Sequence, residues 1–139
     1  MDKYGAARKK LRIVLALLVL SELPVAIFLL FFPHLFVRLY ELAPRPEPFF
    51  IREVGNFLLF AAYLQYLGFR NPEKHLRAVQ LTIVLRVLAG ALELVEITLI
   101  LKTVDLFFGS LLFFCVANFL FAYLIVRYLR QMELKWLEI

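Results

Sequence analysis

The sequence has few of the residues that build cross-linked, irregular or strongly charged chains. Its 139 residues include one cysteine, five glycines, six prolines and two histidines, and charged residues make up only 19%. A single cysteine excludes a disulfide scaffold, and Cys115 lies in an apolar run that gives no information on redox compartment. The low glycine and proline contents exclude collagen-like and low-complexity chains. The low charge excludes a chain that is too polar to fold.

Apolar residues are abundant instead. They make up 63% of the chain, with 15 Phe and 6 Tyr, and the mean hydropathy is +0.83. A soluble domain has about 45–50% apolar and about 25% charged residues. A chain of this length has no interior large enough for so many aromatic rings. The composition therefore predicts an integral membrane protein with one domain, residues 1–139.

The net charge of +5 invites a nucleic-acid interpretation, which the distribution of charge excludes. The basic residues flank apolar stretches and do not form one stripe with interleaved aromatic side chains, as nucleic-acid binding requires. We expect a lipid bilayer and no nucleic acid as the partner.

Four stretches are long enough to cross the hydrocarbon layer, which needs about 20 apolar residues per helix. They cover residues 11–32, 49–68, 76–101 and 106–128. Helices are expected because an isolated strand cannot satisfy its backbone in lipid. The first stretch contains Glu22 and is too long for a cleaved signal peptide, so we expect it to remain as a span. The sequence predicts an all-α membrane protein, a four-helix bundle.

The lysines and arginines in the loops, in the terminal segments and near the ends of the spans predict its orientation. Eleven lie in the N-terminal segment, in the loop after the second span and in the tail, which share one side. The other side has four: Arg38, Arg45, Arg52 and Lys102. By the positive-inside rule, both termini face the cytoplasm. We expect the cell membrane, the inner membrane of a prokaryote, as the location.

Two short similarities raise the question of a duplicated helical hairpin. The segment around Glu22 resembles the segment around Glu93, and Asn56-Phe57-Leu58 resembles Asn118-Phe119-Leu120. An even number of spans per copy gives both copies one orientation. Chance is the alternative, because leucine-rich helices resemble one another easily.

The ionisable residues inside the spans are the most informative. Glu22 lies midway along the first span, and Arg86, Glu93 and Glu96 lie in the third. Each costs about 2.5–3.5 kcal/mol at the bilayer centre, so each should face protein or water and have a partner. We expect Arg86 to pair with Glu22 or Glu93. One positive charge against three carboxylates leaves a surplus, so either Arg52 reaches the cluster or one Glu is protonated.

Other polar residues repeat at helical spacing and predict a hydrophilic interior. In the second span they are Arg52, Asn56, Tyr63 and Tyr66. In the fourth span, Ser110 and Asn118 are eight residues apart and share a face. Gly55 and Gly90 would let helices approach closely.

Three functions fit this expected cluster. It can be structural, a buried ion pair with amide contacts that fixes the helices. It can be a pocket for a lipid-soluble molecule, lined by Tyr63, Tyr66, Asn56 and Asn118. It can be a proton-coupled carrier in which Glu22 or Glu93 titrates.

Enzyme chemistry is disfavoured, and no cofactor or metal is expected. A di-metal carboxylate site in a bundle needs Glu-x-x-His pairs. Glu93 and Glu96 have the spacing, but both histidines, His34 and His75, lie in loops on opposite sides.

The layout resembles the DoxX-like group of small bacterial and archaeal membrane proteins. The residues that carry the resemblance are Arg52-Glu53-Val54-Gly55 at the start of the second span, followed by Asn71-Pro72 and Arg77. The resemblance implies four spans and little chemistry, because members of that group look like accessory membrane subunits of redox systems or proteins of undefined role. Leu20-Ser21-Glu22 is similar to the first span of small multidrug-resistance exporters, but the long outer loop departs from that pattern.

We therefore expect a non-enzymatic membrane subunit or a scaffold that binds an apolar ligand. Its partner would be another membrane protein or a second copy of the chain. The alternative is a homodimeric proton-coupled carrier.

Overall fold

The computed structural model describes residues 3–42, 46–100 and 106–134. These residues are helical with short connections, and they contain no strand. Arg45, Lys102 and Lys135, which entered the orientation count, lie outside them, as does the last residue of the third expected span. The prediction of an all-α chain is confirmed.

Five α-helices and one π-helical segment follow one another along the chain. They are α1 (Lys3–Phe31), α2 (Pro33–Leu39), α3 (Pro48–Arg70), α4 (Leu76–Val95), the π-helical η1 (Glu96–Ile100) and α5 (Leu106–Gln131).

Proline and asparagine set several of these boundaries. Pro33 and Pro48 lie in the first turn of α2 and α3, where the missing N–H leaves no hydrogen bond unmade. Before α4, the Asn71 side chain accepts a hydrogen bond of 3.1 Å from the Lys74 N–H. This local bond stabilises the tight turn between α3 and α4.

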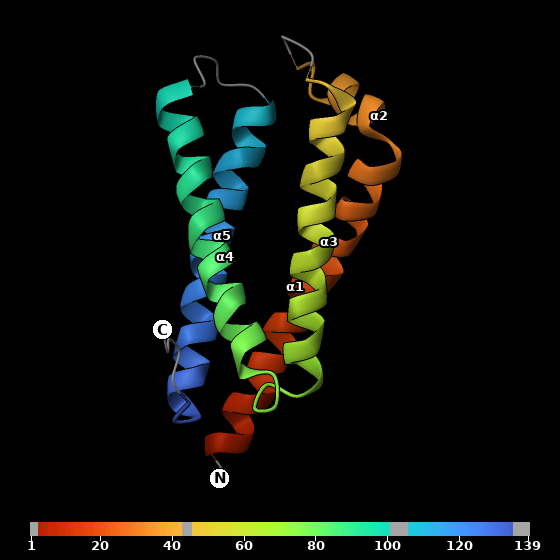
Figure 1. Cartoon of the computed structure of the whole chain (residues 1–139). Coiled ribbons are helices and arrows are strands. Elements are labelled where there is room, and N and C mark those ends of the chain that lie inside the picture. The colour runs from red at the N-terminus through yellow and green to blue at the C-terminus, as the bar shows by residue number, and fades with distance from the viewer. Residues whose placement is uncertain (1–2, 43–45, 101–105, 135–139) are drawn as a thin grey trace.

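The helices form two hairpins (Figure 1). The first hairpin contains α1, α2 and α3, and the second contains α4, η1 and α5. Within each hairpin the long helices pack side by side, and the hairpins contact each other through α1 with α5 and α3 with α4. Figure 1 shows them close together at the end where α1 begins and α5 ends, and diverging toward the end that carries α2.

The buried apolar residues form two clusters whose positions match this arrangement of the hairpins. A large apolar cluster joins α1, α4 and α5 near the chain termini, with Leu11, Leu15, Val79, Ile125 and Leu129 fully buried. A smaller cluster of Leu29, Val37 and Ile51 joins α1, α2 and α3 and belongs to the first hairpin alone. Of these two buried clusters, only the first contains residues of both hairpins.

Three of the four expected spans are long and apolar enough to cross a membrane. They are Lys3–Phe31, Leu76–Leu99 and Leu106–Gln131. The stretch expected at 49–68 forms α3, whose 23 residues meet the length requirement. It is not among the three because polar residues such as Arg52, Glu53 and Gln65 lower its hydropathy.

Candidate functional site

The candidate site is a chain of polar contacts that begins at Glu22 in the middle of α1. Glu22 is 7% exposed, and its Oε2 accepts a hydrogen bond of 2.8 Å from Nε2 of Gln65 on α3. Its other oxygen, Oε1, forms an ion pair with the Arg86 guanidinium of α4. A buried carboxylate needs such partners, since an unpaired charge would be costly in this apolar setting.

The polar contacts continue from Arg86 into the second hairpin. Its Nη1 donates a hydrogen bond of 2.7 Å to Oδ1 of Asn118 on α5. The Asn118 amide in turn donates from Nδ2 to Oε2 of Glu93 at 2.9 Å. Asn118 is 5% exposed, so both ends of its amide are used inside the protein. Arg86 contacts Glu22, one of its two expected partners, and reaches the other through Asn118.

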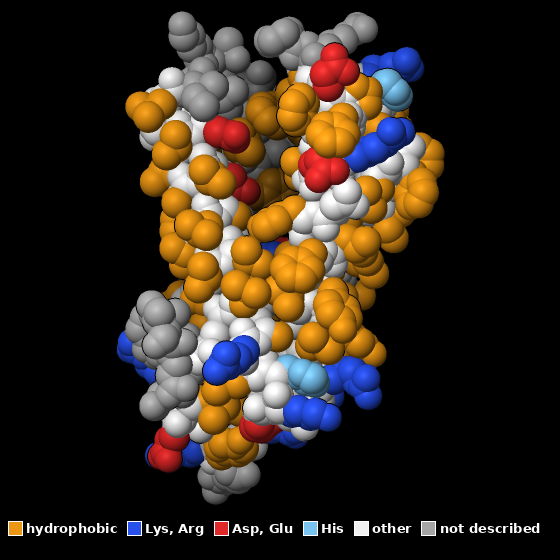
Figure 2. All heavy atoms as spheres, in the orientation of Figure 1, with side chains coloured by type: hydrophobic (Ala, Val, Ile, Leu, Met, Phe, Trp, Pro, Cys, Tyr) orange, Lys and Arg blue, Asp and Glu red, His pale blue; other side chains and the backbone are white. Residues whose placement is uncertain are grey.

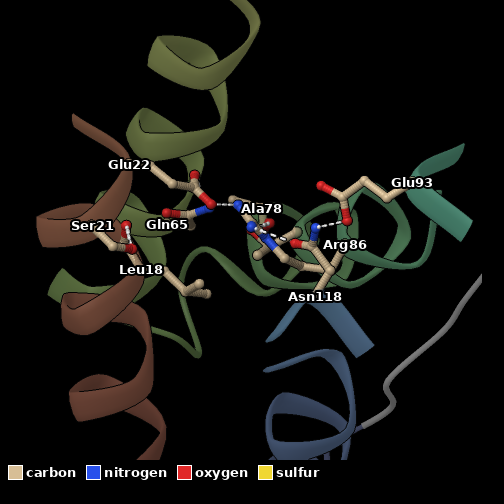
Figure 3. A network of polar contacts seen from close by, with 9 residues as sticks. Leu18, Ser21, Glu22, Gln65, Ala78, Arg86, Glu93 and Asn118 are labelled. Atoms are coloured by element: carbon tan, nitrogen blue, oxygen red, sulfur yellow. Dashed lines mark hydrogen bonds and ion pairs between the residues drawn. The ribbon is translucent and has the colours of Figure 1, made fainter. Parts of the chain in front are cut away.

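We call these five residues, Gln65, Glu22, Arg86, Asn118 and Glu93, the polar network. Each of the four long helices contributes to it, and the close view in Figure 3 shows the side chains meeting between the hairpins. Hydrogen bonds between helices are one of the few directional forces in a lipid environment. The network therefore joins the two hairpins beyond the point where their apolar core ends.

The network contains polar atoms without a hydrogen-bond partner among the described residues. They are Oε1 of Gln65, Nε of Arg86 and Oε1 of Glu22, all shielded from solvent. Glu22 Oε1 has its ion pair with Arg86, which leaves Gln65 Oε1 and Arg86 Nε without a polar contact among the described residues. Gln65 as a whole is only 1% exposed. A buried acceptor or donor that makes no hydrogen bond costs about 1–3 kcal/mol. The two atoms provide one acceptor and one donor for a further polar group.

Figure 2 shows a hollow between the two hairpins in the part of the molecule where they diverge. Acidic side chains lie on its α4 side, apolar side chains cover most of its walls, and charged atoms show through at its inner end. Glu93 is partly exposed, whereas Glu22 is buried. The network thus extends from a partly exposed carboxylate to a buried ion pair.

Four of the predicted site residues lie apart from the network. Arg52 donates from Nε to the backbone oxygen of Leu30 at 3.3 Å, and Asn56 donates to Oε1 of Glu53 at 3.3 Å. Tyr63 is 57% exposed and Glu96 is also exposed.

The expectation that the stripe on the second span would line an interior was therefore wrong. Residues 52, 56, 63 and 66 all lie on an exposed side of α3, because α3 packs through the face that contains Gly55, Ala62 and Gln65. Arg52 lies outside the network as well, so the acidic groups that face the Arg86 charge are Glu22 and Glu93.

Gln65 is the network residue that the sequence reasoning missed. It lies between Ala61, Ala62 and Gly68, small residues that are buried at helix contacts. An amide on a small-residue face is a signal of helix–helix contact in a membrane protein. The aromatic residues Tyr63 and Tyr66 on either side of Gln65 hid this signal.

The expected close approach at two glycines is present. A methyl group at Gly55 would lie 3.1 Å from the backbone oxygen of Ala26 on α1, and one at Gly90 would lie 3.0 Å from the Phe119 ring on α5. Cys115 packs beside Gly90 and donates from Sγ to its carbonyl oxygen at 3.4 Å. Glycine at 55 and 90 is thus required for space and not for backbone conformation.

A second polar contact between the hairpins involves Ser110, which was expected to share a face with Asn118. The Ser110 hydroxyl donates to Tyr40 Oη at 3.3 Å, and the Tyr40 ring packs edge-on against Phe107 at 5.6 Å. Tyr40 ends α2, whereas Phe107 and Ser110 begin α5. This contact joins the hairpins at the end opposite the chain termini.

Metal chemistry finds no support in the part of the chain that the structure describes. No group of three or more His, Cys, Asp or Glu residues there is placed to hold a metal ion. Comparison with protein-family models, with curated proteins and with solved structures finds no match for the chain.

Proposed function

We propose that the chain is a membrane protein with four spans and both termini in the cytoplasm. Three helices have the length and composition of spans, and α3, about 35 Å long, connects them through a 30 Å layer. The N-terminus, the α3–α4 turn and the end of α5 lie at one end of the molecule (Figure 1). A broad apolar surface with charged side chains near both ends supports this arrangement (Figure 2).

In this bilayer the protein acts as a non-enzymatic scaffold that binds a lipid-soluble ligand at the polar network. The observation that carries this proposal is the pair of buried, unpartnered atoms beside the ion pair, Gln65 Oε1 and Arg86 Nε. A purely structural network would be expected to satisfy its own polar atoms, because each unmet bond is destabilising.

The two atoms define the chemistry of the ligand. Arg86 Nε needs an acceptor and Gln65 Oε1 needs a donor. A hydroxyl group provides both, so the ligand is an apolar molecule that carries a hydroxyl or an enol. The apolar walls of the hollow fit the remainder of such a molecule (Figure 2).

The test is mass spectrometry of the organic extract from protein purified in mild detergent. We expect one lipid-soluble hydroxyl compound near equimolar amount with the unmodified protein, lost in Gln65→Leu and retained in Glu96→Gln. The Glu96 variant is the control, because that exposed carboxylate lies apart from the network. Identical extracts from all three proteins would contradict the proposal.

Association with a membrane partner accompanies this function. The motif that carries the resemblance to the DoxX-like group packs within the chain, since Arg52 and Gly55 both contact α1. The surface that would bind the partner is therefore the exposed aromatic side of α3, where Phe57, Phe60 and Tyr63 are more than 40% exposed. Co-purification of a second membrane protein, or of a tagged second copy, tests this association.

One observation favours a second candidate, a proton-coupled carrier. The partly exposed Glu93 connects through Asn118 to the buried Arg86–Glu22 pair. Protonation of one carboxylate would therefore change the hydrogen bonds and the charge around the other. A carrier releases protons when its substrate binds and loses this release in Glu22→Gln or Glu93→Gln. A scaffold shows no such release.

A further inference from the structure

A second candidate site lies near the N-terminus, away from the polar network. A groove of about 540 Å³ runs along α1, with Phe69 of α3 on one side. Arg8, Lys9 and Arg12 line one part of it, and Ile13, Ala16 and Leu17 line the part further along α1. Arg8 and Leu17 are nine residues apart, or about 13 Å along the helix axis.

Protein contacts hold the two arginines in place. Arg8 uses Nε to contact Glu73 Oε1 at 2.7 Å, and Arg12 uses Nε to donate to the Phe69 carbonyl oxygen at 2.8 Å. The Arg12 guanidinium also lies over the Phe69 ring, 5.0 Å from its centre. Both contacts are made through Nε, so the terminal amino groups of each guanidinium remain for an acceptor such as a phosphate.

The charge of the groove is positive. Arg8, Lys9 and Arg12 line it, and Glu73, which contacts Arg8 from the α3–α4 turn, offsets one of these charges. Lys9 is exposed. The neighbouring apolar part of the groove leads into residues 13–20 of α1, which are all apolar.

We propose that this groove binds an anionic phospholipid, with the phosphate at Arg8, Lys9 and Arg12 and an acyl chain beside Ala16 and Leu17. A basic region followed by an apolar one matches a lipid from its headgroup toward its tail. A soluble anion would use the basic part alone. The site relies on the membrane arrangement proposed above but not on the ligand of the polar network.

The experiment is native mass spectrometry of the full chain, titrated with phosphatidylglycerol or phosphatidylcholine in detergent. We expect phosphatidylglycerol to bind more tightly. Lys9→Gln should weaken it about fivefold, because one cation near the headgroups contributes about 1 kcal/mol. The matched control is Arg77→Gln, which removes one exposed cation at the same end but outside the groove and should bind as the unmodified protein does.

A second variant separates the groove from general surface charge. Ala16→Trp fills the apolar part without changing any charge, and we expect it to weaken phosphatidylglycerol at least as much as Lys9→Gln. Lys9 is exposed and has no hydrogen bond or ion pair with another described residue, and thermal unfolding verifies that both variants are folded. Gln65→Leu, which removes a network residue, should keep the phospholipid, so this site and the ligand site can fail separately.

Three results would overturn the proposal. One is equal affinity for the two lipids, and another is unchanged binding in Ala16→Trp. The third is displacement of phosphatidylglycerol by inorganic phosphate at the same concentration, which would make a soluble anion the ligand.

Discussion

Glu22 and Arg86 form an ion pair between two helices whose backbones do not pack together. In the described part of the chain, α1 lies against α3 and α5, and α4 lies against α5 and α3. The long Arg86 side chain therefore spans the space between the hairpins to reach Glu22. The ion pair therefore connects α1 and α4 directly, although these two helices do not pack against each other.

Removing one partner of this bridge should be more damaging than removing both. Arg86→Gln leaves the Glu22 carboxylate buried without a counter-charge, which we expect to lower the free energy of unfolding by about 3–5 kcal/mol. Glu22→Gln/Arg86→Gln should lose less than Arg86→Gln alone, because two neutral amides can bond to each other. Denaturant unfolding in mixed micelles measures the difference. Additive losses would show that the residues are not coupled.

The two asparagines at equivalent positions of the proposed duplication should differ. Asn118→Leu removes the group that bonds both Arg86 and Glu93, and we expect a loss of about 1–3 kcal/mol in unfolding free energy. Asn56→Leu is the matched control, because Asn56 is exposed and bonds only to Glu53; it should stay within about 0.5 kcal/mol. Equal losses of unfolding free energy in the two variants would contradict the different roles assigned to Asn118 and Asn56.

Two glycines provide a similar contrast in packing. In Gly55→Ala the new methyl group would lie 2.9 Å from Leu30 Cγ and 3.1 Å from the backbone oxygen of Ala26, which cannot move aside cheaply. We expect a loss of about 1–3 kcal/mol in unfolding free energy.

Gly109→Ala is the control for that substitution. Among the described residues, no atom outside the adjoining stretch of α5 lies within 4 Å of its new methyl group, so alanine should be neutral or should stabilise α5 through its higher helix propensity. A Gly55→Ala protein as stable as Gly109→Ala would show that α1 and α3 are further apart than described.

Glu73 makes stability depend on pH at the end with the chain termini. Burial raises the pKa of this carboxyl, but hydrogen bonds from its backbone, Tyr4 and Arg8, together with the Arg8 charge, outweigh burial and lower the pKa below 4.5. A lowered pKa stabilises the folded state fully above the unfolded pKa, and this stabilisation is lost as pH falls through the folded value.

We therefore expect thermal stability to fall from about pH 5 downward, and to fall less in Glu73→Gln. Melting temperatures of the two proteins over this range test the prediction. Parallel pH curves would contradict it. Glu53→Gln is the control, because the Glu53 carboxylate is exposed and lies on α3 away from Arg8.

The sequence predicted the helices better than it predicted their faces. Long apolar stretches and the prolines at 33 and 48 were sufficient to place the helices, because both signals are local. Glu22, Arg86, Glu93 and Asn118 could also be predicted, since charges and amides in apolar helices need partners.

The side of α3 that packs inward could not be predicted in the same way. Two polar faces compete on that helix: Asn56 and Tyr63 on one, and Gln65 beside small residues on the other. The choice depends on which face lets α1 approach closely, and only the three-dimensional contacts at Gly55 and Gly68 decide it. Glu96 was predicted to belong to the cluster but lies apart from it, because the π-helical η1 begins there and changes the helical register.

The central claim is that Glu22 and Arg86 meet between the two hairpins. Solid-state NMR of the protein in bilayers, with the Arg86 guanidinium labelled with ¹⁵N and the Glu22 carboxyl with ¹³C, measures this directly. We predict a measurable ¹⁵N–¹³C dipolar coupling. A charge-assisted N–H···O contact holds the guanidinium nitrogen and the carboxylate oxygen about 2.7–2.9 Å apart, and the labelled carbon is bonded to that oxygen. No detectable coupling between the two labels in the folded protein would contradict it.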